Sequence, residues 1–392
     1  MTETALHPAP PAPRRTVRVN AGAIATTIAC VLPVFLVGGL AVQMGDDLDF
    51  TPAGLGLAVS VYFGVSALAS VPSGALVERY GSAVVARAGI LLSAGSLLAV
   101  AGLTRSYPVL VALLALSAAA NALGQLASNA ALARHVPAHR QGLSFGVKQA
   151  AIPVSTLLAG AAVPTVALTA GWRWAFVVAA LAALAALPAV PPAERDRVRP
   201  AAGRAGRATT ALVVVGVAAT LAAAAANALG TFVVDSAAGR GLSPALAGLT
   251  LTLGSAVCVA ARVGAGWLAD RRATGHVALI AAMLVVGAVG LVLLAVAGPV
   301  PLVAGVVLGF GLGWAWPGLM NFAVVRLHPQ APAAATSITQ TGVYAGGCLG
   351  PLGLGTIAEA AGYPAMWVTA AAAMLLAALF MLTGSRLLSR AS

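Results

Sequence analysis

The chain has 392 residues, of which 60% are hydrophobic and only 8% are charged. Because about a quarter of the residues of a soluble domain carry a charge, this composition excludes a soluble fold. The net charge of +12 would favour a nucleic-acid partner in a soluble protein. Here the arginines lie between apolar stretches, and we expect no nucleic acid to bind.

Apolar runs of about 20 residues, the length of a membrane-spanning helix, follow one another along the whole chain. They predict an all-α polytopic membrane protein that crosses the lipid bilayer many times. In the first half we expect helices at 21–44, 54–77, 83–103, 107–133, 141–166 and 173–190. In the second half we expect them at 210–234, 246–269, 275–297, 300–326, 333–358 and 363–384.

A stretch rich in proline, glycine and arginine, PPAERDRVRPAAGRAGRAT, separates the sixth expected helix from the seventh. Such a composition is typical of a flexible linker. The predicted organisation is a cytoplasmic tail at 1–20, an N-terminal six-helix bundle at 21–190, a cytoplasmic linker at 191–209, a C-terminal six-helix bundle at 210–384 and a cytoplasmic tail at 385–392.

The arginines of the loops and tails are divided unequally between the two sides of the membrane. Only Arg105, Arg173 and Arg240 fall on the side opposite the N-terminus. Since cytoplasmic loops carry the excess of positive charge, we expect both termini in the cytoplasm. We expect a multi-pass protein of the bacterial cytoplasmic (inner) membrane.

The two halves of the chain repeat each other. Gly74-A-L-V-Glu78-Arg79 returns as Gly266-W-L-A-Asp270-Arg271, and the segment 129–137 returns at the same offset as 321–329. A constant offset across several helices indicates an internal duplication. Six helices followed by six in the same orientation form a parallel repeat, which is a transporter architecture.

The loop after the second expected helix, GALVERYGSAVVARAG (74–89), resembles the signature of the major facilitator superfamily, and GWLADRRA (266–273) resembles its second copy. This resemblance implies two six-helix bundles around a central cavity and transport by alternating access. It also implies that helices 1, 4, 7 and 10 line the cavity and that helices 2, 5, 8 and 11 form the bundle interface. Glu78 stands where the signature has aspartate, and Ala273 stands where its second copy has glycine.

Acidic and basic residues at the ends of helices 2 and 8 are candidates for gating. Such groups can pair across a bundle interface in one conformation and separate in the other. The alternative is a solvated loop that only sets the topology. The gating candidates are Glu78, Arg79, Asp270 and Arg271.

Two basic residues lie inside expected helices rather than between them. Lys148, the single lysine of the chain, is eight residues from Arg140, and Arg262 is eight residues from Asp270. At 1.5 Å per residue both lie about 12 Å deep, close to the middle of a core about 30 Å thick. No acidic residue is expected at that depth, so the pair favours an anionic substrate. The alternatives are that Lys148 extends toward the membrane surface and that Arg262 caps backbone carbonyls.

Further polar residues are expected near the same depth. Asn121, Gln125 and Asn129 are spaced by four residues and therefore share one helix face. Trp314 shares a helix face with Asn321. For each of these side chains, helix packing is the alternative to ligand contact. The substrate-binding candidates are Lys148, Arg262, Asn121, Gln125, Gln149, Gln340, Tyr344, Trp314 and Asn321.

The sequence therefore predicts a secondary active or facilitative transporter, most readily for a small organic or inorganic anion. An exporter of a neutral or anionic metabolite or drug, and a transport-dead sensor with the same fold, are the alternatives. We expect no enzyme, because the middle of the membrane offers neither a nucleophile with a base nor a metal cluster. We expect neither a cofactor nor a metal ion. We expect the protein to be a monomer. Coupling to protons or to a counter-transported anion, and the direction of transport, stay open.

Overall fold

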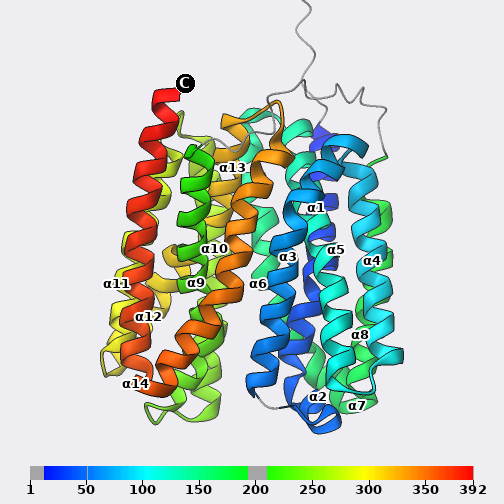
Figure 1. Cartoon of the computed structure of the whole chain (residues 1–392), viewed down its shortest axis with the longest axis vertical. Helices are drawn as coiled ribbons and strands as arrows, with labels where there is room; N and C mark the ends of the chain where they lie inside the picture. Colours follow the sequence, from blue (N-terminus) through cyan, green and yellow to red (C-terminus); the bar gives the residue numbers. More distant parts are fainter. Residues whose placement is uncertain (1–12, 51, 193–209, 392) are drawn as a thin grey trace, which may run out of the picture.

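The helices form two groups that stand side by side, one from each half of the chain (Figure 1). The computed structural model describes residues 13–50, 52–192 and 210–391. Within these ranges the chain is helical almost throughout and holds no strand. The prediction of an all-α polytopic protein is confirmed. The linker expected at 191–209 lies almost entirely outside the described residues, so the predicted boundaries of the two bundles stay a prediction.

The first half folds into long helices joined by short turns. The turns at Gly81 and Gly171 have positive φ angles of 84° and 94°, which glycine adopts without strain. The elements are α1 (Pro13–Gly39), α2 (Ala41–Leu48), α3 (Pro52–Tyr80), α4 (Ser82–Leu103), α5 (Tyr107–His135), η1 (Ala138–Arg140), α6 (Gln141–Ala162), the π-turn η2 (Val163–Ala167), α7 (Leu168–Ala170), α8 (Trp172–Ala185) and η3 (Leu187–Ala189).

The second half has the same plan. Its elements are α9 (Thr210–Ala238), α10 (Pro244–Asp270), α11 (His276–Ala295), α12 (Pro299–Leu308), the π-turn η4 (Gly309–Gly313), α13 (Pro317–Leu327) and α14 (Pro332–Ala391). Helix α14 contains the last two expected helices, which meet at Gly362 with a φ of 81°. Eleven helices of the described residues are long and apolar enough to cross a membrane, with α14 counted once.

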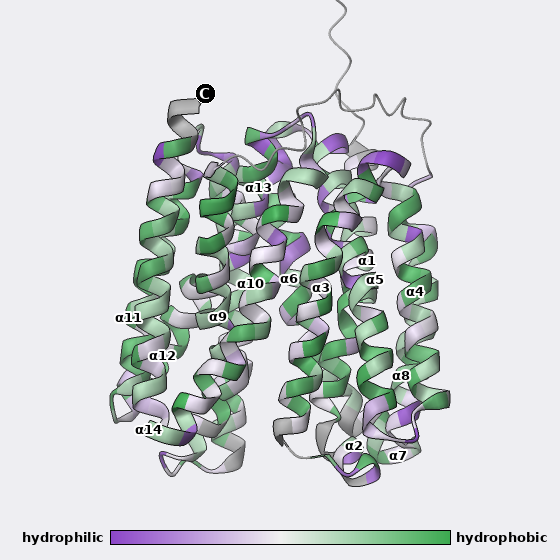
Figure 2. Cartoon of the chain, in the orientation of Figure 1, coloured by the Kyte–Doolittle hydropathy of each residue, from purple (hydrophilic) through white to green (hydrophobic). Residues whose placement is uncertain are grey.

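The surface of the helices is apolar along most of its length. Figure 2 shows hydrophobic residues along the helices and hydrophilic residues concentrated in the turns at their ends. Leu68 and Val300 are 80% and 76% exposed, which in water would be unfavourable and in a bilayer places them against lipid. Many hydroxyl groups inside the helices donate to the carbonyl one turn earlier, as Ser70 does to Ser66 at 2.8 Å. The bilayer offers no water to satisfy them otherwise.

Two expected helices end or break where the sequence pattern did not indicate it. The helix expected at 21–44 ends at Gly39, and α2 follows as a separate element. The helix expected at 300–326 is interrupted by the π-turn and by a turn at residues 314–316. Pro317 has no backbone N–H to continue the helix and is preferred at a first helical position, so α13 begins there.

Contacts between the two groups are most extensive along two helix pairs, α3 with α14 and α6 with α10. These are the second and eleventh, and the fifth and eighth, of the expected helices. At the α6–α10 contact the backbones of Gly142 and Gly266 touch, since a Cβ on Gly142 would lie 2.6 Å from the Gly266 oxygen. Small residues allow this close approach of membrane helices.

Helix α14 packs against α9 through a second glycine stripe, Gly342, Gly346 and Gly350, spaced one turn apart. A Cβ on Gly350 would lie 2.5 Å from the Ala224 Cα, whereas Gly353 has nothing within 4 Å. The α9–α14 contact therefore depends on the absence of a side chain at position 350 and not at position 353.

We predict that Gly350→Leu destabilises the purified protein and that Gly353→Leu does not. Overpacking of a filled contact costs about 1–3 kcal/mol, and an exposed change away from such contacts about 0.5 kcal/mol or less. The check is the melting temperature of both variants in the same detergent. Equal melting temperatures would contradict the packing described for α9 and α14.

Candidate functional site

A stripe of amide side chains runs along the inner face of α5. Asn121, Gln125 and Asn129 are each no more than 2% exposed, and their spacing of four residues places them one above another. The Asn121 amide nitrogen donates to the Ser66 hydroxyl of α3 at 3.3 Å. The stripe therefore faces neighbouring helices and not lipid.

Lys148 of α6 lies against this stripe. Its side chain is fully buried, and its ammonium donates to Gln125 Oε1 and to Asn129 Oδ1, the latter at 3.0 Å. Two of its three protons are thus held by neutral amide oxygens. Lys148 does not extend to the membrane surface, because α5 keeps its ammonium in the interior.

Arg262 of α10 reaches across the bundle interface. Its Nη1 donates to the Gln149 carbonyl of α6 at 2.6 Å, and its Nη2 donates to the Trp314 carbonyl at 3.0 Å. The guanidinium lies 6.0 Å from the centroid of the Trp314 indole ring, and the side chain is 2% exposed. Arg262 therefore joins α6, α10 and the turn before α13 through backbone carbonyls.

The two buried cations belong to opposite bundles and repel one another electrostatically. Within the described residues, both are bonded to neutral groups, and neither forms an ion pair with a carboxylate. A charged side chain without a counter-charge is costly in the interior of a membrane. The site is electropositive.

Several buried polar atoms on the helices that carry or contact these cations have no hydrogen-bond partner within the described residues. They belong to α5, α6, α10, α13 and α14 and to the turn before α13, and they include both donors and acceptors. They are Asn121 Oδ1, Asn129 Nδ2, Gln149 Oε1, Arg262 Nε, Trp316 Nε1, both side-chain polar atoms of Asn321, and the Tyr344 hydroxyl. Since buried polar groups are nearly always bonded, this set fits a place where a polar ligand or water binds.

Tyr344 and Gln340 of α14 lie at the side of this layer. The Tyr344 ring stacks on Phe63 of α3, with centroids 6.1 Å apart. Its hydroxyl lies near the side chains of Gln340 and Asn121, but the geometry of an ordinary hydrogen bond is not reached. These two residues thus connect α14 with the amide stripe of α5.

The structure joins most of the predicted substrate-binding residues through contacts that include residues of both bundles. Trp314 is only partly buried, and the fully buried side chain of Asn321 makes no hydrogen bond within the described residues. The structure also adds Trp316, fully buried with a free indole N–H, and Ser66, which bonds to Asn121. Its position offers a sequence signal for Trp316, which stands ten residues before Arg326 and therefore about 15 Å along the expected helix. Ser66 gave no signal, because small hydroxyl residues are common in membrane helices.

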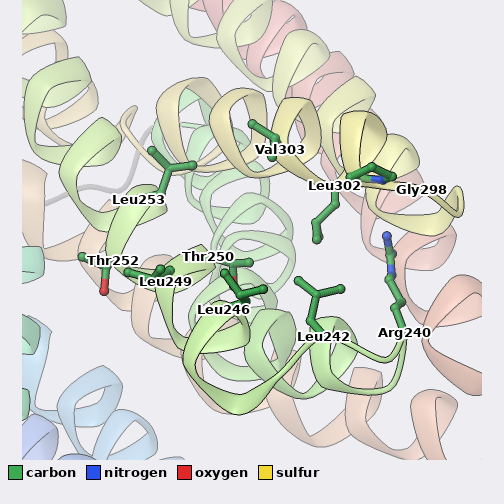
Figure 3. Close-up of a pocket in the computed structure, with 11 residues that line it drawn as sticks. Arg240, Leu242, Leu246, Leu249, Thr250, Thr252, Leu253, Gly298, Leu302 and Val303 are labelled. Carbon is green, nitrogen blue, oxygen red and sulfur yellow. The ribbon is translucent and has the colours of Figure 1, made fainter.

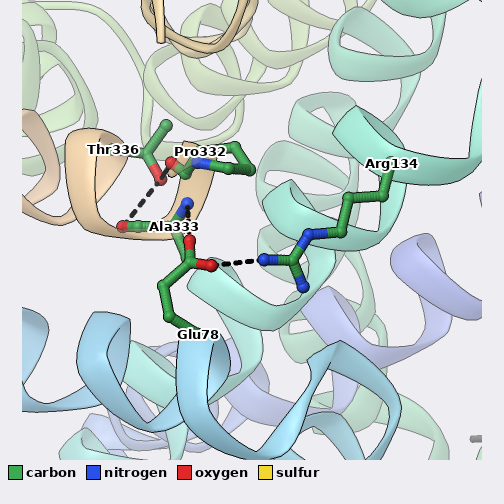
Figure 4. Close-up of polar contacts among 5 residues, drawn as sticks. All are labelled: Glu78, Arg134, Pro332, Ala333 and Thr336. Atoms are coloured by element: carbon green, nitrogen blue, oxygen red, sulfur yellow. Dashed lines mark hydrogen bonds and ion pairs between the residues drawn. The ribbon is translucent and has the colours of Figure 1, made fainter. Parts of the chain in front are cut away.

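At one end of the two bundles, Glu78 in the last turn of α3 joins α3, α5 and α14 (Figure 4). Its Oε2 is paired with the Arg134 guanidinium, and its Oε1 accepts from the Ala333 backbone N–H at 2.9 Å. Ala333 is the second residue of α14, so the carboxylate satisfies an N–H that the helix itself leaves free. The negative charge also opposes the positive end of the helix dipole.

Asp270, at the end of α10, makes the repeat-related contact in the other direction. Its carboxylate oxygens accept from the backbone N–H groups of Gly142 and Leu143 at 2.6 and 2.9 Å. These are the first free N–H groups of α6. Arg326, which is repeat-related to Arg134, adds a favourable charge. Each bundle therefore caps a helix of the other, and this end of the interface is closed.

The two arginines among the gating candidates lie beside aromatic rings. The Arg79 guanidinium is 5.2 Å from the centroid of the Tyr80 ring, and that of Arg271 is 3.5 Å from the centroid of the Trp267 ring. The basic partner seen for Glu78 is Arg134 and not Arg79. Residues 78 and 79 differ by about 100° around the helix, which turns Arg79 away from the contact.

At the opposite end, Asp47 ties α2 to α8. Its carboxylate accepts from the Trp172 indole N–H at 2.8 Å and from Arg173 Nη1 at 2.9 Å. The hydrogen bond from Trp172 and, to a smaller extent, the hydrogen bond from Arg173 hold the pKa of Asp47 below its usual range. Of the three arginines expected on this side, Arg173 thus has an acidic partner.

Comparison with known proteins agrees with this arrangement. The family model described as Major Facilitator Superfamily matches residues 23–351 and 215–390, which together cover most of the chain. The chain belongs to the Major Facilitator Superfamily. The subfamily is not assigned, and no curated protein sequence matches the chain significantly.

Solved structures of this superfamily share the fold. The E. coli fucose:proton symporter FucP has a TM-score of 0.72 and 15% identity, with 95% of this chain and 99% of that chain covered. The proton:xylose symporter XylE has 0.77 and 16%, with 94% and 96% covered. The human organic anion transporter MFSD10 (TETRAN) has 0.73 and 16%, with 95% and 100% covered. At 15–16% sequence identity, the structural similarity shows only that these proteins share a fold with this chain.

Membership in the Major Facilitator Superfamily implies that the chain is a multi-pass membrane protein and a transporter. Its substrates are expected to be small molecules, as in the superfamily at large. The predicted recognition of this superfamily is confirmed. The predicted site residues stay predictions.

We predict that Asp270→Asn weakens the closed end of the interface. Asparagine keeps one acceptor but removes the charge, and a carboxylate at a helix N-terminus contributes about 0.3–2 kcal/mol. Spin labels at Val84→Cys and Thr274→Cys, in a chain without its native cysteines, measure the separation of the bundles at this end.

The expected result is a larger population of long distances in Asp270→Asn than in the parent. Glu359→Gln, which removes an exposed carboxylate from α14, is the control and should leave the distance distribution unchanged. Identical distributions in all three proteins would show that the Asp270 contact does not hold the interface closed.

Proposed function

We propose that the chain transports small anions, organic carboxylates or inorganic oxyanions, by alternating access, and that Lys148 and Arg262 bind the anion between the bundles. The observation that carries this proposal is the pair of buried cations on opposite bundles, bonded within the described residues to neutral groups. Charged side chains inside a membrane are costly and are retained for function. An anion supplies the missing counter-charge.

The two cations keep donors that can reach a ligand. The ammonium of Lys148 has a third proton, and the guanidinium of Arg262 has five N–H groups, of which the one on Nε has no partner. An oxyanion that accepts from both residues would be held by each bundle at once. Such a ligand couples its own binding to the relative position of the bundles.

Neutral polar groups around the cations would orient the substrate. Asn121, Gln149 and Asn321 each have an unbonded side-chain oxygen, and Trp316 has an unbonded N–H. Gln125 holds Lys148 and so positions its charge. Gln340, Tyr344 and Trp314 complete the set as contacts from the C-terminal bundle.

A neutral polar metabolite is the second candidate substrate, with export as the alternative direction. One observation favours it: each terminal nitrogen of Arg262 already donates one hydrogen bond to a carbonyl, while the unbonded amides offer both donors and acceptors. A sensor with this fold would bind the same ligands without transport. FucP and XylE are sugar symporters, and MFSD10 is an organic anion transporter. At 15–16% sequence identity these proteins favour neither substrate class for this chain.

The proposed setting is the bacterial inner membrane, with a monomer whose two termini lie in the cytoplasm. The positive-inside rule supports this orientation. It places Glu78 and Asp270 on the cytoplasmic side, so that their contacts would close the cytoplasmic end and their release would open it. Protons or a counter-transported anion are the proposed coupling partners.

We predict that small anions stabilise the purified protein against heat. A ligand that binds only the folded state adds about 2.7 kcal/mol at a hundred times its Kd. The measurement is the melting temperature with the sodium salts of acetate, lactate, succinate, phosphate and sulfate, compared with glucose and with tetraphenylphosphonium chloride. Stabilisation by glucose or by the cation alone would overturn the anion proposal.

In a positive screen, Lys148→Gln and Arg262→Gln should each lower the affinity for the stabilising anion about ten- to a hundredfold. This corresponds to the roughly 1.5–3 kcal/mol of a hydrogen bond to a charged group. Arg105→Gln, which removes an exposed charge from a turn, is the matched control. If both buried variants keep the affinity of the parent, Lys148 and Arg262 are structural.

A further inference from the structure

A groove lies on the surface of the C-terminal group of helices, between the first turns of α10 and the start of α12 (Figure 3). Its volume is about 640 Å³, which lies in the range of pockets that hold small molecules. The residues that line it are Arg240, Leu242, Leu246, Leu249, Thr250, Thr252, Leu253, Gly298, Pro299, Leu302 and Val303.

The groove opens toward lipid and not toward the layer that holds Lys148. Leu246, Leu249 and Leu253 follow one another at three- and four-residue spacing along α10 and are 53%, 57% and 40% exposed. Val303 of α12 is 52% exposed. In membrane-spanning helices such a stripe lies against hydrocarbon, so the occupant comes from the bilayer.

Among the polar side chains that line the groove, the guanidinium of Arg240 keeps N–H donors available for a ligand. The Thr250 and Thr252 hydroxyls donate to carbonyls of their own helix, at 2.6 and 3.4 Å. Arg240 lies at the mouth of the groove, in the turn before α10 (Figure 3). Its Nη1 donates to the Val296 carbonyl at 3.0 Å, which orients the guanidinium and leaves further N–H groups for a ligand. No acidic residue is among those that line the groove.

The length of the apolar surface fits a hydrocarbon chain. Leu246 and Leu253 are separated by about 10 Å along the helix at 1.5 Å per residue, and Arg240 precedes them at the membrane boundary. A neutral lipid would cover the leucines and leave the guanidinium without a counter-charge. A soluble anion would pair with the guanidinium and leave the leucines uncovered. An amphiphile with an anionic head satisfies both.

We propose that this groove binds an anionic phospholipid, with its phosphate against Arg240 and an acyl chain along Leu246, Leu249 and Leu253. The site is separate from Lys148 and Arg262 and does not depend on the identity of the transported substrate. It distinguishes one lipid from the surrounding bilayer by charge at Arg240 and by shape between α10 and α12.

The test is native mass spectrometry of the full-length protein in detergent, with phosphatidylglycerol or phosphatidylcholine of identical acyl chains added at equal concentration. We expect the parent to bind phosphatidylglycerol about tenfold more tightly, the ratio given by about 1.4 kcal/mol from one charge-assisted contact. Arg240→Gln should bring the ratio close to one. Arg240→Lys should restore part of it, which shows that loss in Arg240→Gln is not misfolding.

Two further variants separate charge from shape. Leu249→Trp places a bulky ring in the groove and should lower phosphatidylglycerol binding while Arg240 is intact. Arg105→Gln removes an arginine from a different turn and should leave the ratio as in the parent. Equal binding of the two lipids by the parent, or an unchanged preference in Arg240→Gln, would overturn the proposal and leave the groove as ordinary lipid-exposed surface.

Discussion

The centre of this protein is constrained by the cost of holding positive charge inside a membrane. Lys148 meets that constraint with two amide oxygens of α5, and Arg262 meets it with two backbone carbonyls. The carbonyl of Gln149 is within reach of Arg262 only because α6 and α10 approach closely at Gly146 and Gly266, where a Cβ has no room. The glycines and the buried charges are thus parts of one arrangement, and the charge it leaves uncompensated favours an anion.

The closed end of the interface follows from the internal repeat. Glu78 caps α14 and Asp270 caps α6, so each half of the chain supplies an acid to a helix of the other. These contacts lie at helix ends near the membrane surface, where the carboxylates and the freed N–H groups can be hydrated once they separate. Such contacts suit a reversible closure better than the buried layer does, since breaking that layer would leave polar groups without partners.

The helices could be predicted from the sequence, because the length of a membrane span is fixed by the thickness of the bilayer and by the rise per residue of a helix. The break at residues 309–316 could not, since the π-turn depends on the close approach of Gly309 and Gly313 to α11. Backbone carbonyls were one predicted alternative for the partners of Arg262, but the sequence could not identify the carbonyls of Gln149 and Trp314 as those partners. Every residue has a backbone carbonyl, so the pattern of side chains does not reveal which carbonyl accepts a hydrogen bond. The pairing of Glu78 with Arg134 was not predicted, because the two residues lie on different helices and only the fold brings them together.

The most direct measurement of the central claim uses the fact that Lys148 is the single lysine of the chain. Protein grown with ¹³C-labelled lysine gives one lysine Cε–H signal, which reports on the site without assignment. We predict that a stabilising anion shifts this signal in a saturable way, and that Arg262→Gln weakens the response. A signal that stays in place while the same anion raises the melting temperature would contradict the account, because the anion would then bind elsewhere.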